Sequence, residues 1–519
     1  MKRKLLYLIL SVGLIAGLTG CYEDQSTEAT HTIPEIVIDT TGIKPLHSLK
    51  RFERLQITPS VSKEDTDPSE FSYKWMLSLQ PIQNTNTIGT YVCIGEEKDL
   101  DAEITVDDDE TPYNLWYQVT DNTTGLRKDI VWQVRVLAPY GEGLLVAESH
   151  DNGKTADLAL IENEHFSTDY TNETLIRHNI FSEANEGAKI EGEVSQIHAF
   201  KKNHKTKYYS IFTKSGEDRL LTMNKKYEVM FRNKECFVEE CADVINPTAF
   251  HVAAGQAAYM VNNNQVHWAW FGDNQWTGQW GPAIPNQGKS VSIDKTFAAG
   301  YGNSPSYWCY YDPTAGCIKK MYNMLMRWDL SSISVVSKGS EWAFDPSNCP
   351  GYECVYGGLA PGNRTYLLLR NKESGKYCVF GANSSGNADR YYEIPEFAAM
   401  DDAIAYATNE NGNVIYFATK NKIYSIVLNA EPVMINEVYS SSEEITHFSI
   451  FRQAKATTDY YAANLIASGN VVLVGTWNGQ NGTVHAIPML NYNTGELQTA
   501  GTVKFEGFGK IMAIIHQFP

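Results

Sequence analysis

Short runs in which apolar and polar residues alternate recur along most of the chain, with turn-forming residues between them. In the first quarter, Phe71–Trp75 and Ile130–Val136 alternate with a period of two, and Leu115–Asp121 runs into an Asn-Thr-Thr-Gly turn. Short strands separated by turns predict a small β-sandwich of immunoglobulin-like type over residues 33–138.

The same pattern continues over residues 139–519, where no long helical periodicity interrupts it. Apolar runs such as Ala257–Val261, Val414–Ala418 and Val471–Thr476 are separated by Gly, Asn, Asp and Ser. This stretch is too long for one sandwich, and at roughly 40–55 residues per blade it predicts a β-propeller of seven or eight blades. Two or three further sandwiches in tandem are the alternative. The expected fold class is therefore all-β.

The N-terminus reads as a targeting segment. Three basic residues, Lys2, Arg3 and Lys4, precede an apolar run that is too short to span a bilayer comfortably. Leu18-Thr19-Gly20-Cys21 resembles the bacterial lipobox, which implies cleavage before Cys21 and lipidation of its thiol. We therefore expect a signal peptide over 1–20 and a polar tether over 21–32, with a short membrane anchor or buried helix as the alternative.

Acidic residues follow the lipobox cysteine directly. Glu23 and Asp24 resemble the surface-export signal of Bacteroidetes lipoproteins. This resemblance implies a protein that is lipid-anchored in the outer membrane and faces the cell exterior.

The segments of the first domain also carry a family resemblance. Phe71-x-Tyr73-x-Trp75, the segment Tyr117–Gly125 and the strand Val131–Val136 resemble the PKD-like domain of Bacteroidetes surface lipoproteins, and Gly143–Val146 fits the junction that follows it. The resemblance implies a place beside a SusC/SusD-type, TonB-dependent transporter. The chain departs from the PKD signature itself, since its Trp-Phe-Gly-Asp run lies far downstream, at Trp270.

Charge excludes one class of partner. The formal net charge is −18, and removal of the three basic residues of the signal peptide makes the mature chain more acidic still. A nucleic-acid-binding protein must supply Lys and Arg to phosphates, so no nucleic-acid partner is expected. The acidic run Asp107–Glu110 has the oxygen ligands that Ca²⁺ prefers, but without a calcium-loop pattern we interpret it as a solvated turn.

Nine cysteines include Cys21, which leaves eight for a protein exported to an oxidising compartment. Cys309 and Cys317 flank a strong turn signal, Asp312–Gly316, and a disulfide across this hairpin is predicted. The alternative is that all eight are small buried hydrophobic residues. The close cysteine pairs lack CxxC spacing and have no paired histidines, so a zinc site is not expected.

No common catalytic or cofactor motif is present: HExxH, GxSxG, the Walker loop and GxGxxG are all missing. Ser149–Thr155 matches part of the sialidase Asp-box, which we interpret as a structural turn on a propeller blade. No cofactor, metal or catalytic residue is therefore predicted.

Four tryptophans form the most suggestive binding feature. Trp268, Trp270, Trp276 and Trp280 fall in a segment rich in Asn, Gln and Gly, and indole faces stack on sugars or on apolar side chains. The alternative is packing, because a spacing of two places Trp268 and Trp270 on one strand face.

The leading hypothesis is a non-enzymatic surface lipoprotein that works with a SusC/SusD-like transporter and other surface lipoproteins in nutrient uptake, binding or retaining a glycan or oligopeptide. A propeller glycoside hydrolase or lyase is the second hypothesis. A structural interaction platform without a ligand of its own is the third.

Overall fold

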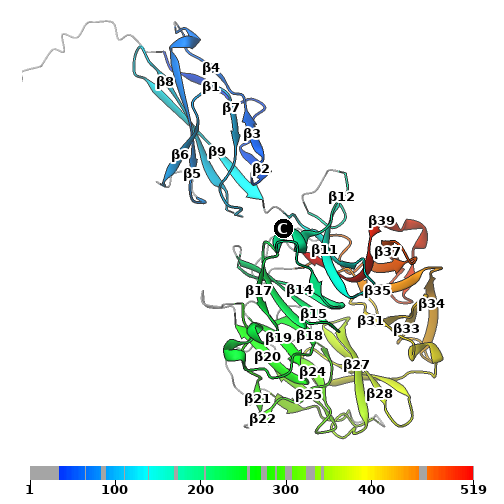
Figure 1. The fold of residues 1–519 in the computed structure, drawn as a ribbon. Helices are drawn as coiled ribbons and strands as arrows, with labels where there is room; N and C mark the ends of the chain where they lie inside the picture. Colours follow the sequence, from blue (N-terminus) through cyan, green and yellow to red (C-terminus); the bar gives the residue numbers. More distant parts are fainter. Residues whose placement is uncertain are drawn as a thin grey trace, which may run out of the picture. The chain divides into compact units, whose positions relative to one another are not determined.

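The computed structural model describes residues 34–517, apart from 65, 83–88, 110, 138–139, 169–172, 204–205, 254–256, 271–277, 287–288, 299–306, 323–332, 340–343 and 455–464. The chain forms two compact units. The first extends to residue 134 without 48–51 and 105–111, and the second contains those two short segments together with 135–519. Each unit is all-β (Figure 1).

The first unit is built on a five-stranded antiparallel sheet. Two short ladders, β1 (Val37–Asp39) with β4 (Ser60–Ser62) and β3 (Arg54–Ile57) with β7 (Leu100–Glu103), complete the sandwich. The strand order of the main sheet is β2 (Leu46–Lys50), β9 (Arg127–Leu137), β8 (Tyr113–Asp121), β5 (Phe71–Ser78) and β6 (Tyr91–Gly95).

Large aromatic side chains fill the core of the sandwich. Trp75, Tyr117 and Trp132 come from three neighbouring strands, and the rings of Trp75 and Tyr117 stack with centroids 4.1 Å apart. The indole N–H of Trp75 donates to the carbonyl of Glu97 at 2.9 Å, so its polar atom is satisfied inside the core. The predicted period-two strands are the ones that supply this inner face.

In the described part of the second unit, seven sheets with three or more strands follow one another along the chain. They are blade 1, β10 (Gly143–Ser149), β11 (Thr155–Glu162), β12 (Leu175–Arg177), β13 (Ile190–Glu191) and β40 (Lys510–Gln517); blade 2, β14 (Val194–Asn203), β15 (Thr206–Thr213), β16 (Leu220–Asn224) and β17 (Val229–Arg232); blade 3, β18 (Pro247–Ala253), β19 (Ala257–Asn262) and β20 (Gln265–Trp270); blade 4, β23 (Phe297–Ala298), β24 (Tyr307–Asp312), β25 (Cys317–Tyr322) and β26 (Ile333–Val335); blade 5, β27 (Tyr352–Ala360), β28 (Arg364–Asn371), β29 (Tyr377–Ala382) and β30 (Ala388–Glu393); blade 6, β31 (Ala405–Thr408), β32 (Val414–Ala418), β33 (Lys422–Val427) and β34 (Met434–Ser440); and blade 7, β35 (Glu444–Ile450), β36 (Val471–Trp477), β37 (Gly482–Asn491), β38 (Glu496–Leu497) and β39 (Val503–Phe508).

The sheets close into a ring. The last strand of the chain, β40, pairs with β10 of blade 1 and also contacts β14 of blade 2 and β35 of blade 7. Blade 1 is thus assembled from both ends of the second unit, which joins the last blade to the first (Figure 1). The predicted propeller is confirmed, with seven blades in the described chain.

Hydrophobic clusters fill every gap between consecutive blades, including the gap between blades 7 and 1. Alternation along β10 shows how: Leu145 faces the cluster shared with blade 2, while its neighbours Leu144 and Val146 face the cluster shared with blade 7. Because both faces of each blade are covered, the middle strands are apolar at nearly every position.

Helical structure is minor in the described residues. The α-helix is α2 (Ile180–Ala184), and the 3-10 turns are η1 (Pro68–Glu70), η2 (Asn233–Cys236), η3 (Val238–Glu240), η5 (Ala398–Met400) and η6 (Thr499–Gly501); β21 (Pro285–Asn286) and β22 (Lys289–Ser290) form a small ladder. None of the helices in the described residues has the length and apolar character needed to cross a membrane.

A buried hydrogen-bond group holds the closing strand. Gln517, at the end of β40, accepts hydrogen bonds through Oε1 from the hydroxyls of Tyr209, at 2.8 Å, and Tyr227, and its amide donates to the carbonyl of Gly141. All three side chains are fully buried. These hydrogen bonds connect the end of β40 to blade 2, through the two tyrosines, and to Gly141, which lies just before β10.

The closure predicts a large effect for Gln517→Leu. This change removes the acceptor that two buried tyrosine hydroxyls share and leaves them only their 3.3 Å contact with each other. Since a buried hydroxyl without a good partner costs about 1–3 kcal/mol, we expect the free energy of unfolding to fall by about 3 kcal/mol. Urea denaturation followed by tryptophan fluorescence measures it. The matched control is Gln480→Leu in an exposed turn, expected to change stability by less than about 0.5 kcal/mol. Equal midpoints for the two variants would contradict this role.

Candidate functional site

The tryptophans expected to bind a ligand occupy different places. Trp268, on β20, is partly buried against the cluster between blades 3 and 4. Trp280 is fully buried in the cluster between blades 2 and 3, where its ring meets Phe250 edge-on at 5.7 Å. Because no face of Trp280 is left for stacking, the ligand-binding expectation is wrong for this residue, and packing is its role.

The other two tryptophans fall outside what the structure describes. Trp270 ends β20, but its side chain is not described, and Trp276 lies in the segment 271–277. The two described rings, Trp268 and Trp280, belong to separate clusters, so the described structure does not bring them together as one platform.

The predicted hairpin exists, but its disulfide does not. Strands β24 and β25 pair across the Asp312–Gly316 turn, with Cys317 opposite Asp312 and Cys309 opposite Lys320. The two thiols are therefore offset along the ladder, and both are unbridged. The prediction of a Cys309–Cys317 bridge is wrong because flanking a turn does not fix the register. Cys309 instead packs in the cluster between blades 4 and 5, and Cys317 is buried outside that cluster.

The acidic run at 107–110 is engaged by cations rather than simply solvated. Within the second unit, Asp107 Oδ1 lies 2.6 Å from Arg51 Nη1, and Asp108 Oδ2 lies 2.6 Å from Lys225 Nζ. Glu110 is outside the described residues. Across the described chain, His, Cys, Asp and Glu form no group of three or more that could hold a metal ion.

The Asp-box-like segment forms a tight turn between β10 and β11. Asp151 accepts hydrogen bonds from the backbone N–H and hydroxyl of Thr155 and from the hydroxyl of Ser149, at 2.7–2.9 Å. Burial opposes ionisation of Asp151, but these donors outweigh it and lower its pKa to about 2. The motif therefore organises a loop on blade 1, as expected for a structural turn.

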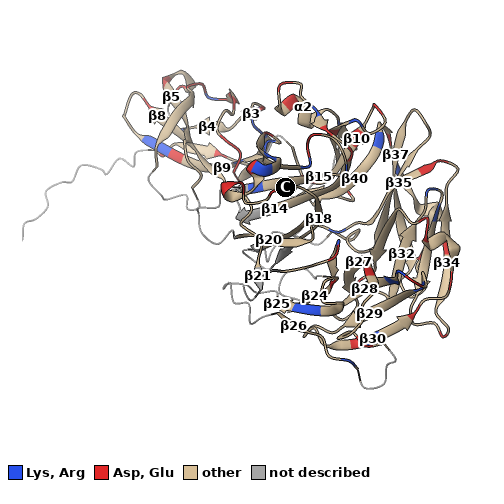
Figure 2. Ribbon diagram, turned by 60° about the horizontal axis from the view of Figure 1, so that its bottom comes forward, with Lys and Arg blue, Asp and Glu red and all other residues tan. Residues whose placement is uncertain are grey.

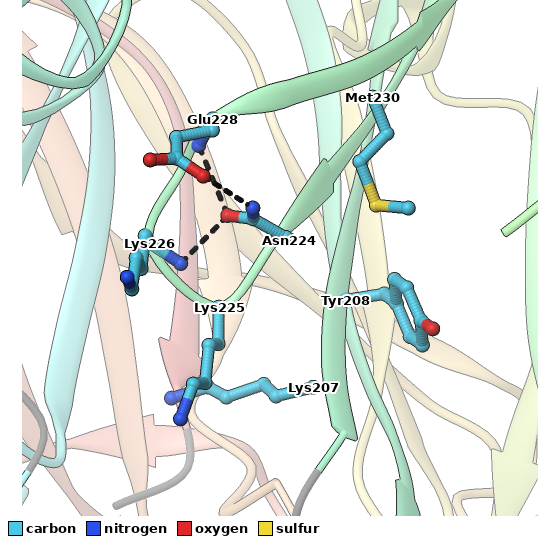
Figure 3. Close-up of a pocket in the computed structure, with 7 residues that line it drawn as sticks. All are labelled: Lys207, Tyr208, Asn224, Lys225, Lys226, Glu228 and Met230. Carbon is cyan, nitrogen blue, oxygen red and sulfur yellow. Dashed lines mark hydrogen bonds between the residues drawn. The ribbon is translucent and has the colours of Figure 1, made fainter. Parts of the chain in front are cut away.

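A pocket of about 260 Å³ lies at the β16–β17 turn of blade 2 (Figure 3). Asn224 shapes this turn: its side-chain oxygen accepts from the backbone N–H groups of Lys226 and Glu228, and its amide donates to the Glu228 carboxylate at 2.7 Å. Tyr227 at the tip has a positive φ of 64° and points into the core, where it is fully buried.

The lining of this pocket combines charge with a small apolar surface. Lysines dominate it, and Figure 3 shows Tyr208 and Met230 lying together as the apolar part. Lys207 is 8% exposed, whereas Lys226 and Glu228 are exposed. The ammonium of Lys225 is already paired with Asp108 at 2.6 Å.

Sequence reasoning missed this pocket. Its one signal is the Lys225-Lys226 pair in a chain that is acidic overall. In Figure 2, Lys and Arg are interspersed with Asp and Glu over the blades in view.

The family expectation from the sequence is confirmed. Residues 21–193 match the model of the PKD-like family, so the N-terminal third of the chain is PKD-like. The match covers the sandwich and the strands β10–β13, and it ends directly before β14, where blade 2 begins.

No curated protein matches the chain. Among solved structures, a quinonprotein alcohol dehydrogenase-like protein from Bacteroides thetaiotaomicron is 11% identical with a TM-score of 0.40, covering 93% of this chain and 99% of the other. A DUF4784 family protein from Bacteroides caccae is 7% identical with a TM-score of 0.29, covering 93% and 98%. AztD from Citrobacter koseri is 9% identical with a TM-score of 0.36, covering 86% and 98%. These likenesses concern the fold only.

Burial predicts which thiols react. Cys93 and Cys241 are exposed, whereas six cysteines are buried: Cys236, Cys309, Cys317, Cys349, Cys354 and Cys378. Burial raises the pKa of Cys309 and of Cys349 to about 12. Since the thiolate is the nucleophile, we expect N-ethylmaleimide to label only the two exposed thiols of the native protein. Intact-mass spectrometry measures this count. Labelling in urea is the control, with eight adducts expected for a chain without Cys21, and native labelling beyond two would contradict the assignment.

The lowered pKa of Asp151 predicts a pH dependence. Its folded-state pKa is about 2 against 3.8 in the unfolded chain, so its stabilising contribution is fully present above pH 3.8 and is lost as the pH falls towards 2. The difference in unfolding free energy between wild type and Asp151→Asn should therefore be constant from pH 5 to 7 and shrink below pH 4. Urea titrations at each pH measure it. A difference that grows towards low pH would contradict the hydrogen-bonding role.

Proposed function

We propose that this protein is a lipid-anchored surface protein of the outer membrane that serves as an accessory, non-enzymatic component of a SusC/SusD-type uptake complex and binds or retains a glycan or oligopeptide. The observation that carries the proposal is the PKD-like match, which begins at Cys21, the cysteine that the lipobox marks for lipidation. Lipidation of this residue anchors the chain to the membrane, because several acyl chains on one site give stable binding.

The described carboxyl groups with a shifted pKa do not include a proton donor of the kind a glycosidase uses. A propeller glycosidase needs a carboxylic acid with a raised pKa as its proton donor. In the described chain, every carboxyl group whose pKa the structure shifts has it lowered, which favours the ionised form. These groups are Asp39, Asp67, Asp101, Asp121, Glu142, Asp151 and Asp345.

Ligand retention rather than deep enclosure suits the surface of the propeller. The blade 2 pocket is smaller than the roughly 300–1,000 Å³ of sites that enclose a whole small molecule. It accommodates one side chain or one sugar unit of a longer ligand, with Tyr208 and Met230 as the apolar wall. A protein that holds part of a polymer near a transporter needs no more enclosure than this.

The anchor and the partner are tested together. In the producing bacterium we expect the wild-type protein to sediment with the outer membrane, to be cleaved by protease added to intact cells, and to co-purify with a TonB-dependent transporter. Cys21→Ala should move it into the soluble fraction, because the lipidated thiol is gone. Cys241→Ala, which removes an exposed cysteine elsewhere, is the matched control and should leave the membrane fraction unchanged.

Two results would count against the proposal. Recovery of no TonB-dependent transporter from detergent-solubilised membranes would remove the uptake role. Turnover of a glycan that is abolished by changing one carboxylate would replace the binding role by the hydrolase alternative.

A further inference from the structure

The outer face of the five-stranded sheet in the sandwich carries two parallel rows of side chains across four strands. The inner face is defined by Trp75, Leu115 and Tyr117, which are buried in the core. Positions next to these point the other way, because side chains alternate along a strand. The strand register places the outward positions of β6, β5, β8 and β9 side by side.

One row is apolar. It consists of Cys93, Met76, Trp116 and Val131, which are register partners from strand to strand. Cys93 is exposed and the other three are partly exposed. The outer face of an antiparallel sheet is usually polar where it meets water, so a continuous apolar row marks a surface that has a binding partner.

The adjacent row is polar. It consists of Tyr91, Ser78, Asn114 and Gln133. Tyr91 and Ser78 are register partners, as are Asn114 and Gln133, and the backbone N–H of Asn114 donates to the hydroxyl of Ser78. Neither row contains a charged side chain. Four strands at about 4.8 Å spacing give the two rows a length of about 14 Å, and two residues along a strand separate them by about 7 Å.

Polar atoms around the junction of the rows lack partners. Asn114 is fully buried, and neither its amide nitrogen nor its oxygen has a hydrogen-bond partner among the described residues. The same holds for the indole N–H of Trp116 and the hydroxyl of Tyr91. Native proteins leave few buried polar groups unsatisfied, so several together on one sheet face indicate a missing bonding partner.

Aromatic rings lie directly beside these atoms. The rings of Tyr91 and Trp116 are 5.4 Å apart between centroids and tilted by 48°. Because Ser78 is the small residue that separates Tyr91 from Asn114 in the polar row, the tyrosine ring reaches the tryptophan across it. Aromatic surface, an amide with both donor and acceptor unused, and further donors are thus gathered on one face.

We infer that this face is a carbohydrate-binding site for a neutral glycan. Indole and phenol rings stack against the C–H face of a sugar ring. The partly exposed Gln133 amide can bond its hydroxyls, which are donors and acceptors at once, whereas the fully buried Asn114 amide can do so only where binding uncovers it. Both rows lack charge, and the next row carries Lys74 and Asp129, whose opposite charges cancel, so the face favours neutral sugars over uronic acids. An extended peptide would add to a sheet edge through its backbone, whereas these rows lie on a sheet face. This inference deepens the proposed function and rests on it for its biological setting.

The test is native affinity electrophoresis of the full mature chain through gels that contain an α-glucan, a β-glucan, a mannan or a xylan, with polygalacturonate as the charged comparison. We expect retardation by at least one neutral polysaccharide. Trp116→Ala should weaken the apparent affinity at least tenfold. The matched control is Phe52→Ala, an aromatic residue of the same unit that is 60% exposed and outside the rows; it should bind like wild type.

Asn114→Leu separates a binding role from a structural one. Replacing an unsatisfied amide by an apolar group of similar size should raise the melting temperature by a few degrees. If Asn114 bonds the sugar, the same variant should lose at least fivefold in affinity although it is more stable. Unchanged affinity in both Asn114→Leu and Trp116→Ala, with a folded protein, would overturn the site.

The outcomes also separate this inference from the proposed function. Retardation by none of the neutral polysaccharides, or binding to oligopeptides alone, overturns the carbohydrate site and leaves the uptake role standing if the transporter still co-purifies. Glycan binding that depends on Trp116, in a protein that recovers no transporter, supports the site and removes the uptake role instead.

Discussion

Closure of the ring is the constraint on which the second unit depends. Each blade covers one face of each neighbour, so a ring with one blade missing or loose exposes two apolar sheet faces. The chain meets this constraint by pairing its last strand, β40, with β10, the first. The buried group around Gln517 fixes the end of that strand to Tyr209 and Tyr227 of the next blade. Burial on both faces then explains why β10 is buried at all seven of its positions.

The closure also buries polar groups, and those around Glu142 are matched by partners. Glu142, just before β10, accepts from the backbone N–H and hydroxyl of Thr168 and lies 3.2 Å from His516 Nε2. His516 Nδ1 accepts from the backbone N–H of Ala454, so the ring proton is on Nε2, which faces the carbonyl of Phe166. Burial disfavours the charged form of Glu142, but its hydrogen bonds outweigh burial and lower its pKa. These contacts join strand ends from the first and last blades. They also satisfy polar groups that would be costly to bury without a partner.

Sequence patterns predicted the parts that depend on periodicity and missed those that depend on register. Alternation in Phe71–Trp75 and Ile130–Val136 located strands of the sandwich, and recurring short apolar runs predicted a propeller, whose seven blades are fixed by closure rather than by any repeat readable in the sequence. Spacing could not separate a core tryptophan from a ligand-binding one, because Trp280 and a surface tryptophan look alike in a list of residues. Proximity in sequence likewise suggested a Cys309–Cys317 bridge, which the offset between the two strands prevents.

The two units therefore differ in which faces of their sheets are covered by packing. In the propeller, both faces of every blade are used to hold the ring, so recognition falls to turns such as Asn224–Glu228, whose side chains already bond one another. In the sandwich, the inner face of the five-stranded sheet supplies Trp75 and Tyr117 to the core. The opposite face carries the partly exposed row of Met76, Trp116 and Val131. Trp116 lies between Met76 and Val131 in the register of three strands, with its ring centroid 5.4 Å from that of Tyr91. A sheet that presents aromatic and amide groups in fixed rows favours recognition, because its geometry is set before the ligand arrives.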